Sequence, residues 1–184
     1  MFAGIIKKTG IVKKIIFSKK EIQIGIKTHL KLSKKDIGSS INCSGVCLTL
    51  SNIFKGLYYF YLSKETLKNS NFKNIKLNCV INLEKPLKFG NEISGHFVQG
   101  HVDTTSILKK KHIHGKSCYL YFSISNNYKK FLNYKSSIAI NGVSLTIAKV
   151  LAKSFLVVVI PHTLKSTSLK NINKNDIVNI EIDI

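Results

Sequence analysis

The chain contains no arginine, no tryptophan and only nine acidic residues among its 184. All 29 basic residues are therefore lysine, and the formal net charge is +20. Such a charge is typical of nucleic-acid-binding proteins, but arginine, the usual bidentate reader of guanine and phosphate, is missing. The lysines are scattered, with short clusters such as 109–111 in place of a long tract. Lysine, isoleucine and asparagine share A/T-rich codons, so a biased genome explains the charge, and we expect no nucleic-acid partner.

Long hydrophobic runs are also absent. No apolar stretch approaches the roughly 18–20 residues of a membrane span, and the N-terminus has no basic stretch before an apolar core, as a secretory signal would. We therefore expect a soluble, cytoplasmic protein with no membrane partner. The four cysteines form no C-x-x-C pair, which argues against a zinc ribbon or redox motif and predicts free thiols.

What the chain does contain is an internal repeat. The segment SSINCSGVCLT returns as SSIAINGVSLT, so that Cys47 corresponds to Ser144 at a shift of 97 residues. At the same shift, TLK returns as TLK and NLE as NIE; these matches pair 66–68 with 163–165 and 82–84 with 179–181. Chance matches do not keep one register across half a chain, so the repeat predicts two copies of one structural unit.

Two copies are too few for a solenoid, and each copy is long enough to be a small domain. The stretch 84–92 carries one of the two prolines, a glycine and mixed charges, which is typical of a connection. We therefore predict an N-terminal domain at 1–90 and a C-terminal domain at 91–184.

Within each copy, apolar residues alternate with polar ones, which indicates half-buried strands. The alternating sets are Ile22, Ile24 and Ile26; Leu120, Phe122 and Ile124; and Ile180, Ile182 and Ile184. The apolar run 155–160 is typical of a strand buried on both faces, whereas helical signal is limited to one or two turns near 67–71 and 127–134. Short, regularly spaced strands with Gly, Ser and Asn turns predict an all-β fold with short helices, in which each half is a closed antiparallel barrel.

Several segments resemble the riboflavin synthase family. The most specific is SGHFVQGHVD at 94–103, with its G-H-x-x-x-G-H-V-D pattern. The opening MFAGII and the two segments of the repeat around Cys47 and Ser144 also match, as do KETL at 64–67 and NIEID at 179–183. The resemblance covers nearly the whole chain in the right order, and it implies two tandem six-stranded Greek-key barrels.

The activity implied by this resemblance is the last step of riboflavin biosynthesis, without a cofactor. A four-carbon unit passes between two 6,7-dimethyl-8-ribityllumazine molecules, giving riboflavin and 5-amino-6-(D-ribitylamino)uracil. Each barrel is implied to bind one lumazine, and the reaction site to form where the first barrel of one subunit faces the second barrel of another in a homotrimer. Association with lumazine synthase is a further implied partnership. The family usually continues into a C-terminal helix that holds the trimer together; the sequence stops at residue 184, so we expect that helix to be missing.

The resemblance implies chemical roles for four side chains near the reacting atoms. Cys47, Ser144 or a bound water is expected at the nucleophilic addition that precedes ring opening. His101 and Thr146 are candidates for moving protons at the acidic ring methyl. The plain alternatives are an inert core thiol at Cys47 and turn hydroxyls at Ser144 and Thr146.

The resemblance implies two further catalytic candidates near the substrate. Phe2 is expected to cover the site, with plugging of the barrel as its alternative. Lys135 is expected to offset negative charge on the methyl-deprotonated anion. His96 and His101 suggest a metal pair, but five residues apart on a strand they would face opposite sides, so we predict no metal site.

An uncharged heterocycle with a polyol tail needs several hydrogen bonds, because each contributes only about 0.5–1.5 kcal/mol net. Backbone groups in turns suit the ring edge, and the hydroxyls of Thr49 and Thr146 and the carboxylate of Glu65 suit the polyol. The substrate-binding residues that the resemblance implies are Gly4, Ile5, Ile6, Ser40, Val46, Cys47, Leu48, Thr49, Tyr61, Leu62, Ser63, Lys64, Glu65, Thr66, Gly100, His101, Val102, Lys135, Ser144, Leu145, Thr146, Ile160, Pro161, His162, Thr163, Leu164 and Lys165.

The sequence departs from the family pattern at Ser44, where asparagine is usual before Gly45, and this predicts a changed turn in the first barrel. The second copy keeps asparagine at Asn141, where some members have aspartate, so a carboxylate has no role there. A lumazine- or flavin-binding antenna protein shares the implied fold without turning its chromophore over. Such proteins usually lose polar site residues in one half, whereas both halves keep them here. A basic nucleic-acid-binding barrel is the third reading, and it predicts affinity that falls steeply with salt.

Overall fold

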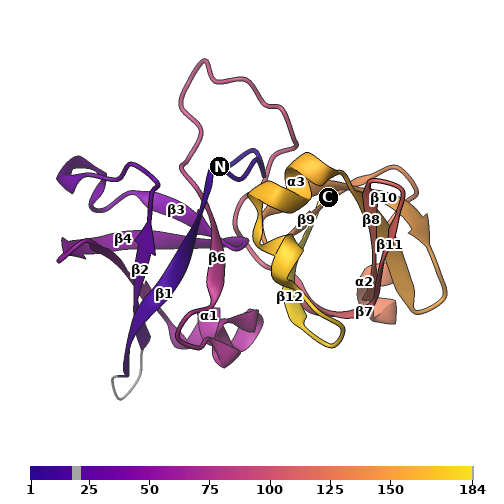
Figure 1. Cartoon of the computed structure of the whole chain (residues 1–184), viewed down its shortest axis with the longest axis horizontal. Coiled ribbons are helices and arrows are strands. Elements are labelled where there is room, and N and C mark those ends of the chain that lie inside the picture. Colours follow the sequence, from indigo (N-terminus) through magenta and orange to yellow (C-terminus); the bar gives the residue numbers. More distant parts are fainter. Residues whose placement is uncertain (18–21, 184) are drawn as a thin grey trace.

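The computed structural model describes residues 1–17 and 22–183 and shows two closed barrels side by side (Figure 1). Ile184, predicted at the end of the last strand, lies outside the described residues. The first barrel has the strand order β1-β2-β5-β4-β3-β6 and all its strand pairs are antiparallel. Its strands are β1 (Lys8–Phe17), β2 (Ile22–Thr28), β3 (Ser40–Cys43), β4 (Val46–Phe54), β5 (Leu57–Leu62) and β6 (Val80–Glu84).

The second barrel repeats this topology. Its closed order, β10-β11-β8-β7-β12-β9, is that of the first barrel with every strand number raised by six. Its strands are β7 (Thr104–His114), β8 (Ser117–Ser123), β9 (Ser137–Ile140), β10 (Val143–Val150), β11 (Ser154–Val159) and β12 (Ile177–Ile182). The prediction of an all-β fold with two tandem six-stranded Greek-key barrels is confirmed. The strands of each barrel fall within one predicted domain, and the boundary between residues 90 and 91 stays a prediction.

The helices are short and occupy equivalent places in the two copies. They are α1 (Lys64–Asn69), α2 (Asn126–Lys129) and α3 (Pro161–Ser166), with 3-10 turns η1 (Lys34–Asp36), η2 (Asn71–Asn74) and η3 (Ser168–Asn171). The side chain of Ser63 caps α1 by accepting a hydrogen bond from the Thr66 N–H. Pro161 opens α3, where a missing N–H costs nothing. None of these helices in the described residues has the length and apolar character needed to span a membrane.

Each barrel encloses its own apolar core, filled by the alternating residues of its strands. Ile24, Ile26 and Phe60 are completely buried in the first core, as are Phe122 and Phe155 in the second. The run 155–159 is almost entirely buried, as its composition predicts. Ile160 ends this run outside the strand, 56% exposed, and caps α3.

The two barrels contact each other through reciprocal turns. The side-chain amide of Asn82 donates to the Asn141 carbonyl at 2.9 Å, and that of Asn179 donates to the Ser44 carbonyl at 2.8 Å. Between these turns the backbones of Gly45 and Gly142 touch: a Cβ on Gly142 would lie 2.7 Å from the Gly45 nitrogen. The contact from Asn82 to Asn141 is thus repeated by the contact from its equivalent, Asn179, to Ser44, the equivalent of Asn141. Such reciprocal contacts mean that the barrels are related by an approximate two-fold axis.

The prediction of a changed turn at Ser44 is wrong. Ser44 and Asn141 have the same left-handed backbone, with φ of 47° and 46°. The Ser44 hydroxyl accepts the Asn82 N–H at 3.0 Å, just as the Asn141 side-chain oxygen accepts the Asn179 N–H at 2.8 Å. The serine therefore preserves the turn by replacing the amide acceptor with a hydroxyl, although asparagine tolerates positive φ better.

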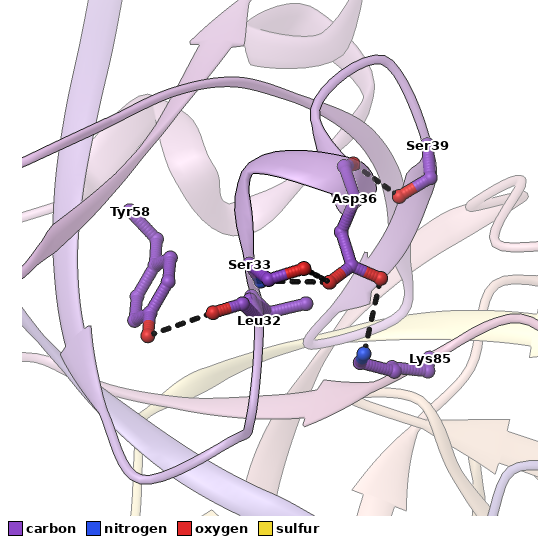
Figure 2. Close-up of polar contacts among 6 residues, drawn as sticks. All are labelled: Leu32, Ser33, Asp36, Ser39, Tyr58 and Lys85. Carbon is purple, nitrogen blue, oxygen red and sulfur yellow. Dashed lines mark hydrogen bonds and ion pairs between the residues drawn. The ribbon is translucent and has the colours of Figure 1, made fainter.

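The connection from β2 to β3 is anchored to the chain just after β6 (Figure 2). Asp36 accepts the Ser33 N–H at 2.7 Å and forms an ion pair with Lys85 at 3.1 Å. These contacts, led by the Ser33 N–H, hold the pKa of Asp36 below its usual value. The connection to the second barrel thus leaves the first from a fixed point, and it arches outside both barrels beside the N-terminus (Figure 1).

Candidate functional site

Each barrel is preceded by an opening segment that lies on the other barrel. The Cys47 N–H in β4 donates to the Gly100 carbonyl at 2.8 Å, and the Ser144 N–H in β10 donates to the Gly4 carbonyl at the same distance. Val102 packs against the first core, whereas Ile6 packs against the second. The segment before β7 therefore lies against Cys47 on the first barrel, and the segment before β1 lies against Ser144 on the second; these two places are the candidate sites.

At both of these backbone contacts the residue of the opening segment must be glycine. Gly4 has φ of +71° and Gly100 has φ of +82°, the left-handed region that glycine enters without penalty. A Cβ on Gly4 would lie 2.7 Å from the Ser144 Cβ, and one on Gly100 would lie 2.7 Å from the Cys47 Cβ. The structure thus brings Gly4 to Ser144 and Gly100 to Cys47, pairs that the prediction named without joining them.

In the first-barrel site, which is the site around Cys47, the residues of β4 divide by burial. Cys47 is half-buried and Thr49 is exposed, opposite Ser40 on β3. Val46, Leu48 and Leu62 point into the core and are less than a tenth exposed, so toward a ligand they can offer only backbone groups. All four cysteines are free thiols, as predicted, and burial raises the pKa of Cys43.

In the second-barrel site, which is the site around Ser144, a histidine reaches the hydroxyl. His96 Nδ1 lies 2.7 Å from the Ser144 Oγ. Burial lowers the pKa of His96 below its ordinary value of 6.5, and the nearby charge of Asp183 opposes this shift only in part. Burial thus favours the neutral imidazole, and a neutral imidazole within hydrogen-bond reach of a hydroxyl can act as its base.

Sequence reasoning missed this role of His96, which it considered only as a metal partner of His101. The assumed strand is also wrong: between β6 and β7 the chain is irregular, apart from an isolated bridge at Val98. In the part of the chain that the structure describes, no group of three metal-ligating side chains occurs. The signal that could have found the contact is the G-H-x-x-x-G-H pattern itself, which contains both histidines.

Phe2 is completely buried where the two copies meet. It packs with Val98 and Ala139 and against Cys47, and its backbone pairs with Val98 through hydrogen bonds of 2.7 and 3.0 Å. The side chain therefore lies beside the first-barrel site as part of a small apolar cluster. The contact with Cys47 is the packing that the structure shows, and a covering role for Phe2 stays a prediction.

The structure places most of the remaining predicted residues at exposed or half-buried positions, and Leu164 packs against the second core. Thr146 is exposed on β10, and Lys135 is exposed just before β9, with φ of 69° and its Nζ 5.3 Å from the Tyr134 ring centroid. Glu65 accepts a hydrogen bond from Asn69 on α1. Tyr61, Ser63, Lys64, Thr66, Ile160, Pro161, His162, Thr163, Leu164 and Lys165 lie on or next to α1 and α3, which follow β5 and β11.

Two hollows are lined by residues that the structure describes. A cleft of about 800 Å³ between η2 and η3 is lined by described residues that include no predicted catalytic residue. A hollow of about 590 Å³ beside the connection is lined by Ala3, Lys85 and their neighbours, with Ile5 from the predicted binding set. Neither hollow is lined by Cys47 or Ser144.

Comparison with known proteins defines the class. The model of the lumazine binding domain family matches residues 3–86 and 99–183, one match for each barrel. Solved structures of LumP share the fold over the full length of both chains: the complex with riboflavin has a TM-score of 0.89 at 22% identity. The complex with 6,7-dimethyl-8-(1'-D-ribityl) lumazine has a TM-score of 0.87 at 21% identity. The chain therefore consists of two lumazine binding domains and has the fold of LumP.

Curated relatives are more similar in sequence. The riboflavin synthase of Buchnera aphidicola subsp. Baizongia pistaciae (strain Bp) is 37% identical over the whole chain and 87% of the relative. That of Photobacterium leiognathi is 36% identical over the whole chain and 85% of the relative. That of Escherichia coli (strain K12) is 33% identical over the whole chain and 87% of the relative. The chain belongs to the riboflavin synthase family.

Proposed function

We propose that this protein is an enzyme that converts two molecules of 6,7-dimethyl-8-ribityllumazine into riboflavin and 5-amino-6-(D-ribitylamino)uracil. The observation that carries the proposal is the duplicated site, in which Cys47 meets Gly100 and Ser144 meets Gly4 through the same 2.8 Å contact. Two identical substrate molecules require two similar pockets. Relatives of similar length that bear the name riboflavin synthase support the same reading.

The proposed reaction moves a four-carbon unit from one lumazine to the other. Its two products together contain the atoms of two substrate molecules, so the transfer needs neither oxidant nor reductant. The protein must chiefly hold the heterocycles in a reactive orientation, which can lower a barrier by about 7–11 kcal/mol. Proton transfer by positioned side chains adds roughly 10²–10⁴-fold.

Ser144 and His96 are the side chains best placed for proton transfer. With its pKa lowered by burial, His96 can accept the proton of the Ser144 hydroxyl, or of a water bound there, during addition to the ring of one lumazine. Breaking the O–H bond passes that proton to the imidazole as the new C–O bond forms. The later ring opening would return the proton to a ring nitrogen.

The remaining candidates have matching places in the proposal. Cys47 supplies the equivalent group of the first-barrel site, and His101 and Thr146 handle protons at the ring methyl. Lys135 offsets the charge of the deprotonated methyl, and Phe2 walls the site. Single Cys47→Ala, Ser144→Ala and His101→Ala variants test these roles through lumazine turnover; full activity in all three would remove those residues from the mechanism.

Productive contact between two bound lumazines also requires an assembly. In the proposal, the first-barrel site of one subunit faces the second-barrel site of another within a homotrimer, and lumazine synthase is a candidate partner. Sedimentation of the purified protein measures the assembly directly. A monomer at concentrations that support turnover would contradict it.

The alternative function is an antenna that binds a lumazine or flavin without turnover, favoured by the fold similarity to LumP. Against it, both copies keep polar side chains at equivalent places, Cys47 in one and Ser144 in the other. Incubation with the lumazine separates the two functions. Growth of riboflavin fluorescence identifies an enzyme, and unchanged lumazine fluorescence identifies a carrier.

A further inference from the structure

Two buried carboxylates hold the opening segments in place. Glu84, near the end of β6, accepts the N–H of Ala3 at 2.8 Å and that of Gly4 at 3.2 Å. Glu181, in β12, accepts three consecutive backbone N–H groups, from Gln99 at 2.5 Å, Gly100 at 2.9 Å and His101 at 3.1 Å. The two glutamates are equivalent in the repeat.

The surroundings of these glutamates are unfavourable for charge. Glu84 is 3% exposed and Glu181 is 8% exposed, and within the described ranges 1–17 and 22–183 neither forms an ion pair. Burial raises the pKa of both carboxyls, while the backbone N–H groups oppose the shift. Backbone donors are thus the main partners of each carboxylate, and hydrogen bonds to a charged acceptor are the stronger kind.

Each glutamate holds a segment that contacts the opposite barrel. Glu181 belongs to the second barrel, but the segment it holds puts the Gly100 carbonyl on Cys47 of the first barrel. Glu84 belongs to the first barrel, but the segment it holds puts the Gly4 carbonyl on Ser144 of the second. A glutamate of each barrel therefore holds the segment that lies over the candidate site of the other barrel.

We infer that Glu181 is a positioning residue for the ligand of the first-barrel site and that Glu84 is one for the ligand of the second-barrel site. The ligand class, a lumazine or flavin ring, rests on the proposed function; the crossed coupling rests on the contacts alone. A local structural role would instead make each glutamate matter most for its own barrel.

The test is the binding of riboflavin to the full chain, read site by site. In a Cys79→Ser background Cys47 is the one half-buried thiol, since Cys43 and Cys118 are buried, and bound riboflavin should protect it from alkylation. Glu181→Gln replaces one carboxylate oxygen by an N–H donor facing N–H groups. We expect the riboflavin concentration that halves the alkylation of Cys47 to be about tenfold higher in this variant than in the Cys79→Ser parent. In Glu84→Gln the same concentration should rise by less than about twofold.

The reverse pattern is expected at the second-barrel site. There the reporter is the thiol introduced by Ser144→Cys with Cys47→Ser, and Glu84→Gln should weaken its protection while Glu181→Gln spares it. Glu92→Gln, an exposed carboxylate in the connection, is the matched control and should change neither site. Equal weakening at both sites by either variant, or weakening only at the glutamate's own barrel, would overturn the inference.

Two further measurements keep the inference testable if a glutamine variant folds poorly or riboflavin does not bind. Gly100→Ala and Gly4→Ala push the same segments away from Cys47 and Ser144 and should reproduce the two patterns separately. Amide hydrogen exchange needs no ligand: Glu181→Gln should speed exchange at the Cys47 N–H, which donates to the Gly100 carbonyl, and leave the Ser144 N–H unchanged. Exchange that changes equally at these two N–H groups contradicts the crossed coupling, whatever the turnover.

Discussion

Asn82 and Asn179 occupy equivalent positions in β6 and β12, and each side chain reaches across to the opposite barrel. Asn82 donates to the Asn141 carbonyl and accepts the Ser168 N–H at 2.7 Å. Asn179 makes the same pair of bonds with the Ser44 carbonyl and the Asn71 N–H, the latter also at 2.7 Å. The two side chains are completely or almost completely buried, so this exchange is one of the contacts that hold the barrels together.

Removing either side chain should therefore destabilise the whole molecule. Asn82→Ala leaves a buried carbonyl and a buried N–H without partners, and we expect a loss of about 2–4 kcal/mol in the free energy of unfolding. Asn179→Ala should cost a similar amount. Urea denaturation measures both, with Asn52→Ala, an exposed asparagine on β4, as a control expected within about 0.5 kcal/mol of the parent. Losses no larger than that of the control would show that the barrels dock by other means.

The turn at Ser44 offers a gain in stability. Its φ of 47° suits asparagine better than serine, and Asn141 shows that the amide fits the equivalent turn. We expect Ser44→Asn to raise the free energy of unfolding by up to about 1 kcal/mol. The reciprocal Asn141→Ser should lower it by a similar amount. A destabilised Ser44→Asn protein would mean that the two turns differ in the space around them.

The state of His96 predicts how activity depends on pH. Its pKa is lowered below 6.5 by burial, with Asp183 as the opposing charge, so the imidazole stays neutral until the pH falls below the ordinary histidine value. Turnover should decline as His96 is protonated, and His96→Gln should lose most activity together with this acidic limb. His29→Gln, an exposed histidine after β2, should retain both. An unchanged profile in His96→Gln would exclude the imidazole as the base.

The same shift has a consequence for stability. Between the lowered pKa of His96 and 6.5, the unfolded chain binds more protons than the folded one, so the free energy of unfolding falls as the pH falls through this window. His96→Gln should flatten this part of the pH profile. Thermal melts across the window measure it, and an equally steep profile in the variant would assign the effect to another group.

The ion pair between Asp36 and Lys85 should contribute little by itself. It is partly exposed, so Lys85→Met should cost less than about 1 kcal/mol. Asp36→Ala also removes the bond to the Ser33 N–H and should cost about 1 kcal/mol more. Because the pKa of Asp36 is lowered, its contribution is present above its ordinary pKa of 3.8 and is lost as the pH falls through the lowered value. Equal losses in the two variants would leave the Ser33 contact without a role.

Much of the fold could be predicted because the information is local and repeated. Alternation at Ile24 and Ile26, or at Leu120 and Phe122, identifies strands, and the shift from Cys47 to Ser144 identifies two copies. The 3-10 turns and α3 have weak local signals, such as the capping side chain of Ser70 before η2 and Pro161 as the first residue of α3. Loops could not be placed in this way, and the segment around Val98 forms a bridge and not a strand.

For the candidate site, the sequence could name residues but could not predict which of them contact one another. The motifs named Gly4, Gly100, Cys47 and Ser144, but the pairing of Gly4 with Ser144 joins residues far apart in sequence and depends on how the barrels dock. Glu84 and Glu181 were visible as a repeated N-x-E pattern, yet nothing in the sequence says that their partners are backbone N–H groups. The family resemblance named the residues, whereas the structure showed that each opening segment contacts the opposite barrel.

The most direct test of the account is the product balance of the purified protein supplied with 6,7-dimethyl-8-ribityllumazine alone. Chromatographic quantification should show one riboflavin and one 5-amino-6-(D-ribitylamino)uracil for every two lumazines consumed, with loss of turnover when Cys47 and Ser144 are both replaced by alanine. Lumazine that binds in two sites and is recovered unchanged would contradict the account.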